Sequence, residues 1–203
     1  MGNWYTNIAI KGAAQPDVLA ALNELGRRSY VTPENHGWVV IYDQECDKFD
    51  LDELESLALT ISTRLSCTAL ASFNADDDVL WIGAFEAGTR TARYASAREQ
   101  FEDSAEFPAL LEVAEVLCRM FGKSGQVMNV QKILRRGHGA LGLLTLLLPK
   151  LRVAYIAEVV RHADLAKSLG IPLATVGLGY RYVNRGKTPP GMNRDALQRT
   201  LAG

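Results

Sequence analysis

The pattern of hydrophobic and polar positions differs between the two halves of this chain. Residues 1–96 alternate short runs of β-branched and aromatic side chains, which are typical of strands, with two stretches of helical spacing. Residues 109–203 have mainly helical spacing. Strands are expected at residues 4–10, 30–32, 38–42, 67–73, 79–82 and 89–94.

The helix expected after Asp50 has the most complete signature. Asp50 is placed to cap its first turn, and Glu53 stands where a capping box has its carboxylate. Its apolar positions repeat at helical spacing and form one inner face: Leu51, Leu54, Ala58, Ile61 and Leu65. An earlier helix is expected to open at Pro16 and to close at Gly26.

The resulting order is strand, helix, strand, strand, helix, strand, followed by one more hairpin. This is the order of the ferredoxin-like fold, an antiparallel sheet with two helices on one face. We therefore predict an α+β protein with a ferredoxin-like sheet, two helices and an extra hairpin, followed by a helical C-terminal half. The expected domains are an acidic ferredoxin-like domain at 1–96 and a basic, mainly helical domain at 109–203, joined by a connector at 97–108.

In the second half, helices are expected at 111–121, 127–136 and 140–148, and one long helix or two between 151 and 169. The segment 140–148 is the most apolar run of the chain. It is far shorter than the roughly 20 residues that a membrane span needs. We therefore interpret it as a buried core helix and expect no association with a membrane.

Charge is distributed unevenly, although the net charge of the 203 residues is only −1. Residues 1–117 contain 8 Lys/Arg and 20 Asp/Glu, whereas residues 118–203 contain 14 and 3. Such a separation indicates either an anionic partner or two halves that attract each other. The second explanation needs no outside molecule, which slightly favours it.

The sequence offers little for metal, disulfide or cofactor chemistry. Cys46, Cys67 and Cys118 are widely separated, which predicts a reducing, cytoplasmic location. The Gly-x-Gly-x-x-Gly at 137–142 follows a helical pattern instead of a strand, so we expect a turn between helices there. The acidic run 76–78 is expected to form a hairpin tip. We predict no cofactor, no metal site and no catalytic residue.

The histidines also lack a chemical signature. His36, His138 and His162 stand far apart, without the spacing of metal ligands. We therefore expect each of them in a turn or at the surface.

The stretch 162–185 admits three interpretations. Its small and apolar residues have the spacing of a helix-turn-helix, in which the second helix reads DNA. Against this, Gly177 and Gly179 would lie inside that second helix, where each costs about 1 kcal/mol relative to Ala. Residues 180–183 also suit an extended segment. A structural junction between a helix and a strand is the favoured interpretation, a DNA-reading helix is the main alternative, and a ligand-binding loop is the third.

Four segments carry a resemblance to a group of known proteins: His162, Leu169–Pro172, Gly177–Tyr182 and Asp76–Trp81. With these segments the chain resembles an uncharacterised bacterial family, in which a His-containing helix, a Leu-Gly-Ile-Pro turn and a Gly-Leu-Gly-Tyr-Arg-Tyr segment close the chain. The family has no assigned function, so the resemblance implies no activity and no functional residue.

Basic and aromatic side chains supply the candidate binding residues. These are Arg135, Arg136, Tyr180, Arg181, Arg185 and Lys187, with Lys132 nearby. They could converge to meet phosphate or an acidic protein surface. Alternatively, the basic residues at helix C-termini simply complement the helix dipoles.

Together these patterns predict a non-enzymatic cytoplasmic protein that works as a binding or interaction module for an unknown protein or anionic ligand. The alternative is a DNA-binding regulator that uses residues 162–185. A small-molecule enzyme of unidentified class is the third hypothesis. The sequence leaves the oligomeric state open.

Overall fold

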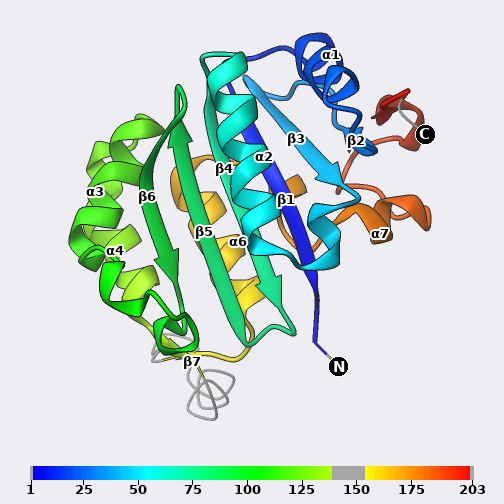
Figure 1. The fold of residues 1–203 in the computed structure, drawn as a ribbon. Helices are drawn as coiled ribbons and strands as arrows, with labels where there is room; N and C mark the ends of the chain where they lie inside the picture. Colours follow the sequence, from blue (N-terminus) through cyan, green and yellow to red (C-terminus); the bar gives the residue numbers. More distant parts are fainter. Residues whose placement is uncertain (1, 139–153, 202–203) are drawn as a thin grey trace.

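The computed structural model describes residues 2–138 and 154–201. Its centre is a seven-stranded antiparallel sheet in the order β6-β5-β4-β1-β3-β2-β9 (Figure 1). The strands are β1 (Tyr5–Lys11), β2 (Ser29–Val31), β3 (Trp38–Asp43), β4 (Thr68–Ala75), β5 (Val79–Glu86), β6 (Thr89–Ala95) and β9 (Gln198–Arg199). A separate parallel pair joins β7 (Gly137–His138) to β8 (Ala154–Tyr155). The predicted α+β class is therefore confirmed.

Two helices, α1 (Gln15–Glu24) and α2 (Leu51–Arg64), cover one face of the sheet (Figure 1). Asp50 caps α2 as expected, because its Oδ1 accepts a hydrogen bond of 3.1 Å from the Glu53 amide. The Glu53 carboxylate does not complete a capping box; it forms an ion pair with Arg27, which lies in the loop between α1 and β2. This pair ties α2 to the loop that follows α1.

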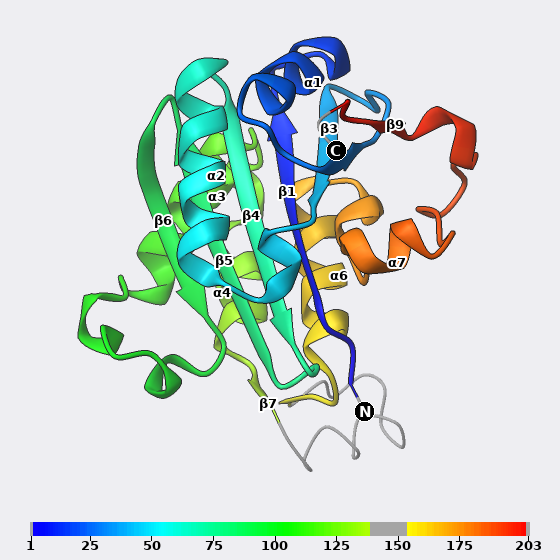
Figure 2. The same ribbon diagram turned by 45° about the vertical axis from the view of Figure 1, so that its right-hand side comes forward.

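The other face is covered by α3 (Leu110–Met120), α4 (Val127–Arg135), α6 (Glu158–Leu169) and α7 (Tyr180–Asn184), as Figure 2 shows. Short 3-10 segments connect these elements: η1 (Cys46–Lys48), η2 (Arg98–Gln100), η3 (Ser104–Glu106), η4 (Ser124–Gln126), η6 (Leu173–Thr175) and η7 (Arg194–Ala196). Alternation along β1 divides the core, since Ile8 and Ile10 pack toward α1 and α2 while Ala9 packs toward the second helical layer.

The C-terminal part of the chain also contributes to the sheet. β9 pairs with β2, and the Thr200 hydroxyl accepts a 3.0 Å hydrogen bond from the Ser29 amide and donates a 2.6 Å bond to the Arg27 carbonyl. Residues after 108 are thus helical only in part. The expected connector 97–108 contains two 3-10 turns, and Arg93 of β6 forms an ion pair with Asp103 in it.

Two expectations for the second half are wrong. The helix expected between 151 and 169 begins only at Glu158, because Ala154 and Tyr155 are held in β8. The favoured junction between a helix and a strand is also wrong: residues 180–184 form the short helix α7, whose inner side chains Tyr180 and Val183 are buried. Tertiary packing here outweighs the strand propensity of these residues. The core helix expected at 140–148 lies outside the described residues.

Candidate functional site

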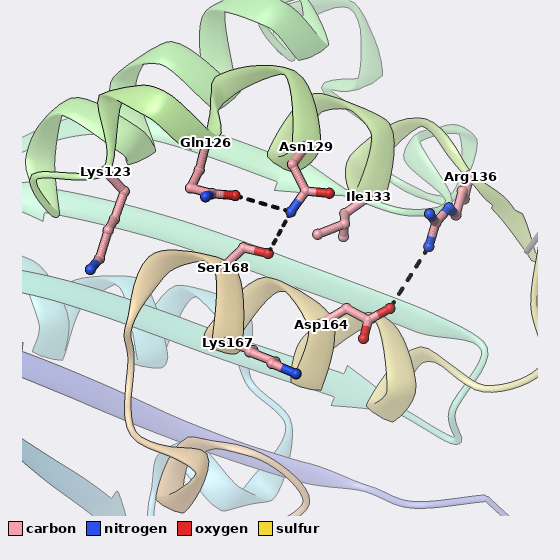
Figure 3. A pocket seen from close by; sticks show the side chains of 8 residues that line it. All are labelled: Lys123, Gln126, Asn129, Ile133, Arg136, Asp164, Lys167 and Ser168. Carbon is pink, nitrogen blue, oxygen red and sulfur yellow. Dashed lines mark hydrogen bonds and ion pairs between the residues drawn. The ribbon is translucent and has the colours of Figure 1, made fainter. Parts of the chain in front are cut away.

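A groove of about 590 Å³ runs between the antiparallel helices α4 and α6 (Figure 3). Its lining is mostly polar and carries three basic side chains and one acidic side chain: Lys123, Gln126, Asn129, Ile133, Arg136, Asp164, Lys167 and Ser168. Both helices turn their apolar stripes to the sheet, with Val130 and Leu134 buried on α4 and Leu165 and Leu169 buried on α6. Their polar stripes are left to form the walls of the groove.

A hydrogen-bonded bridge crosses the middle of the groove. The Asn129 Nδ2 donates to Oε1 of Gln126 over 3.3 Å and to Oγ of Ser168 over 3.0 Å. Both amide hydrogens of Asn129 are thereby used. The amide nitrogen of Gln126 and the hydroxyl hydrogen of Ser168 remain as possible donors to a bound molecule.

A second hydrogen-bonded bridge lies at one end of the groove, where Tyr155 joins Arg136 to Asp164. The Tyr155 hydroxyl donates to Oδ2 of Asp164 over 2.9 Å and accepts from Nη1 of Arg136 over 3.0 Å. The Arg136 guanidinium also lies 3.8 Å from the Asp164 carboxylate. Burial, followed by the charge of Asp164, raises the pKa of Tyr155 to about 12, so this hydroxyl keeps its proton. Arg136 is therefore largely neutralised within the protein.

The opposite end of the groove is cationic. Lys123 follows α3, and its side chain lies beside Gly170, the residue that ends α6. A Cβ added at Gly170 would be 3.0 Å from the Cε atom of Lys123. Four exposed basic side chains in and beside the groove make no ion pair within the described residues: Lys123, Lys132, Arg135 and Lys167. Because α4 contains no acidic residue, its outer surface keeps this positive charge.

The six residues predicted for binding do not line one pocket. Arg136 lines the groove between α4 and α6, and Arg135 lies on the outer surface of α4. Tyr180, Arg181 and Arg185 instead line a pocket of about 550 Å³ beside α7, which covers the same face of the sheet as α4 but near the β2 and β3 edge (Figure 1). Their roles in binding remain predictions.

Arg181 is held by groups of the N-terminal half. Its backbone amide donates to Oδ2 of Asp47 over 2.8 Å, and its guanidinium lies 4.3 Å from the ring centre of Phe49. Burial raises the pKa of Asp47, and the Arg181 amide and charge work against that rise. Arg185 is exposed, whereas Lys187 lies over the ring of Tyr182 at 4.6 Å.

A buried polar cluster beneath α6 is the feature that the sequence did not reveal. The expectation that His162 lies in a turn or at the surface is wrong, since its side chain is 1% exposed. Its Nδ1 lies 2.7 Å from the Tyr5 hydroxyl and its Nε2 lies 3.4 Å from the Ser72 hydroxyl. Burial lowers the pKa of His162 to about 4, so the ring is neutral at pH 7.

A buried ion pair stands next to this cluster on the same helix. Arg161 and Glu158 bond through two nitrogen–oxygen pairs at 2.7 and 3.0 Å, and Nη1 of Arg161 donates to the carbonyls of Ile133 and Leu134 in α4. Helical spacing places the buried residues of α6 on one face: Glu158, Arg161, His162, Leu165, Ala166 and Leu169. That periodicity was the one signal that could have placed the polar members inside.

The acidic run 76–78 forms the expected turn between β4 and β5. The Asp76 carboxylate accepts from the amide of Gly2 over 2.5 Å, and that of Asp77 accepts from the amide of Asn3 over 2.9 Å. Across residues 2–138 and 154–201, no group of three His, Cys, Asp or Glu side chains is arranged to hold a metal ion. The same part of the chain contains no helix with the length and apolar character of a membrane span.

Comparison with known proteins adds no identification. No protein-family model, curated protein or solved structure matches the chain. The resemblance to an uncharacterised bacterial family therefore stays a prediction, and the function is argued from the geometry alone.

Proposed function

We propose that this protein is a non-enzymatic binding module for an anionic partner, which it meets with the basic surface of its second half. The observation that carries the proposal is that Lys132, Arg135 and Lys167 are exposed on α4 and α6 and form no ion pair with any residue of 2–138 and 154–201. Basic residues at helix ends also complement helix dipoles, which explains Arg135. Lys132 and Lys167 also lie in the last turns of α4 and α6, so the dipoles explain their positions too. Their ammonium groups nevertheless stay exposed and form no ion pair within the described residues, which leaves their charge available to an anion.

Charge separation in the fold supports the same proposal. The acidic segment 1–117 supplies β1 to β6 and the helices of one face. It also supplies most of α3, so only Glu112 and Glu115 of its acidic residues lie on the helix that packs against α4. The positive charge of α4 is consequently only partly compensated within the chain. This weakens the explanation in which the two halves merely attract each other.

The fold supports different roles for two segments of the chain, a scaffold and a binding unit. The order β4-β1-β3-β2 with α1 and α2 on one face is the order of a split βαβ arrangement. We propose that residues 1–96 form a ferredoxin-like unit that serves as the scaffold. Residues 109–203 then form the basic unit that covers its other face, and 97–108 connects them.

The DNA-reading alternative has weaker support. The helix that would enter the major groove is α7, which has only five residues. Its inner side chains are buried, and the Arg181 amide and guanidinium are bound to Asp47 and Phe49. Few side chains of α7 are left to reach base edges.

Fluorescence anisotropy tests the proposal. The full chain is titrated into a labelled poly-glutamate peptide, a labelled mixed-sequence DNA duplex and a labelled neutral peptide at several salt concentrations. We expect binding to at least one anionic probe that weakens steeply with salt, and no binding to the neutral peptide. Absence of binding to both anionic probes at low salt would contradict the proposal.

A further inference from the structure

We propose that the groove between α4 and α6 is the docking surface for an extended acidic segment of a partner protein, which lies along the groove axis. This inference rests on the proposed anion-binding function and adds both the site and the class of partner.

The positions of the charged groups favour an extended occupant over a compact anion. Figure 3 shows Lys123 and Arg136 at opposite ends of the groove, and Lys167 on the wall formed by α6. The three side chains do not converge on one point. The nine residues of α4 span about 14 Å, the length of roughly four residues of extended peptide. Carboxylates spaced along such a peptide would meet Lys123 and Lys167 in turn, while Arg136, which is already paired with Asp164, marks the far end of the groove.

The middle of the groove suits a peptide backbone. The amide of Gln126 and the hydroxyl of Ser168 are placed between the charged ends, and the bonds from Asn129 fix their positions. A peptide offers carbonyl oxygens to such donors at regular intervals. Groups that are already oriented lose less conformational freedom on binding, which favours affinity.

One further feature favours a protein partner over a nucleic acid. Met128 is 72% exposed on the outer surface of α4, on the same stripe as Lys132 and Arg135. An exposed methionine beside basic residues is a contact typical of protein interfaces.

The test compares two charge reversals of equal size on different surfaces. One variant carries Lys123→Glu and Lys167→Glu in the groove, and the matched control carries Arg185→Glu and Lys187→Glu after α7. All four side chains are exposed and lack ion pairs within the described residues, so both variants are expected to fold, which circular dichroism checks. Each protein is titrated into a labelled peptide of alternating Glu and Ser and into a labelled oligothymidine of equal charge.

We expect the groove variant to bind the acidic peptide at least about tenfold more weakly than the wild type, and the control variant to bind within about threefold of it. The wild type is expected to prefer the peptide to the oligothymidine. In a heteronuclear NMR titration of the wild type, the peptide should shift amides of α4 and α6 more than those of α7.

Three results would overturn the inference. If only the control variant loses affinity, the docking surface is α7, while the proposed anion-binding function stands. If the oligothymidine binds more tightly than the peptide and depends on Lys123 and Lys167, the partner is a nucleic acid. If the wild type binds neither probe at low salt, the inference and the proposed function both fail.

Discussion

The Tyr5 hydroxyl lies 2.7 Å from Nδ1 of His162, across 157 residues of sequence, and both side chains are at most 1% exposed. Burial raises the pKa of Tyr5, so its hydroxyl keeps its proton and is able to donate it to Nδ1. The remaining nitrogen, Nε2, then carries the proton that faces Ser72. This contact joins the first strand to α6, the helix that forms one wall of the groove.

The buried imidazole makes the fold sensitive to acid. Its pKa is lowered from 6.5 to about 4, so the unfolded chain takes up this proton at a higher pH than the folded protein does. His162 is neutral in both states above pH 6.5, and stability is lost as the pH falls from there toward 4. The full difference corresponds to about 3 kcal/mol.

Urea unfolding of the wild type and of His162→Gln at several pH values measures this loss. The wild type should lose stability more steeply than the variant below pH 6.5. His36→Asn, which removes an exposed histidine, should keep the slope of the wild type. Parallel slopes for the wild type and His162→Gln would contradict the buried-histidine account.

Removal of the Tyr5 hydroxyl should also destabilise the folded protein. In Tyr5→Phe, the shape of the ring is kept while Nδ1 of His162 loses its partner in a dry environment. We expect a loss of about 1 to 3 kcal/mol in the free energy of unfolding. The control is Tyr30→Phe, whose hydroxyl bonds Asn184 at the surface and whose loss should be smaller. Equal stabilities of the two variants would show that the buried bond contributes little.

Breaking the buried ion pair of α6 should reduce the stability of the protein more than breaking an ion pair at the surface. Arg161→Met removes the two bonds to Glu158 and the donor to two carbonyls of α4, at a site that is 1% exposed. We expect a loss of about 3 to 5 kcal/mol. Arg64→Met, which breaks the exposed pair with Glu24, should cost less than about 1 kcal/mol. Thermal unfolding of both variants makes the comparison.

Gly179 is required by the close approach of Asp47. A Cβ at this position would lie 2.3 Å from Oδ1 of Asp47, although the backbone is extended and suits any residue. Gly179→Ala should therefore cost about 1 to 3 kcal/mol. The same change should cost less in an Asp47→Ala background, because the clash is removed. Gly125→Ala meets nothing within 4 Å and is the neutral control. Additive effects of the two changes at 47 and 179 would contradict the clash.

Several elements could be predicted from the sequence because their signals are local. The cap of α2 by Asp50 and the acidic turn at 76–78 depend on residues a few positions apart, and both were predicted. α7 was misassigned for the opposite reason. Its residues have strand propensity, but Asp47 binds its second backbone amide from 134 residues away and thereby stabilises a helix.

The same division applies to the candidate site. The sequence by itself determined that the second half is basic and that α4 lacks acidic residues, since charge is a property of composition. Only the tertiary structure decided which cations are paired. Arg136 and Arg181 find partners through contacts between separate segments, whereas Lys123 and Lys167 form no ion pair in the part of the chain that the structure describes. The spacing of apolar residues in the sequence predicted which residues share a face of a helix. What that face meets depended on how distant strands and helices pack, and this placed His162 inside and the lysines along an open groove.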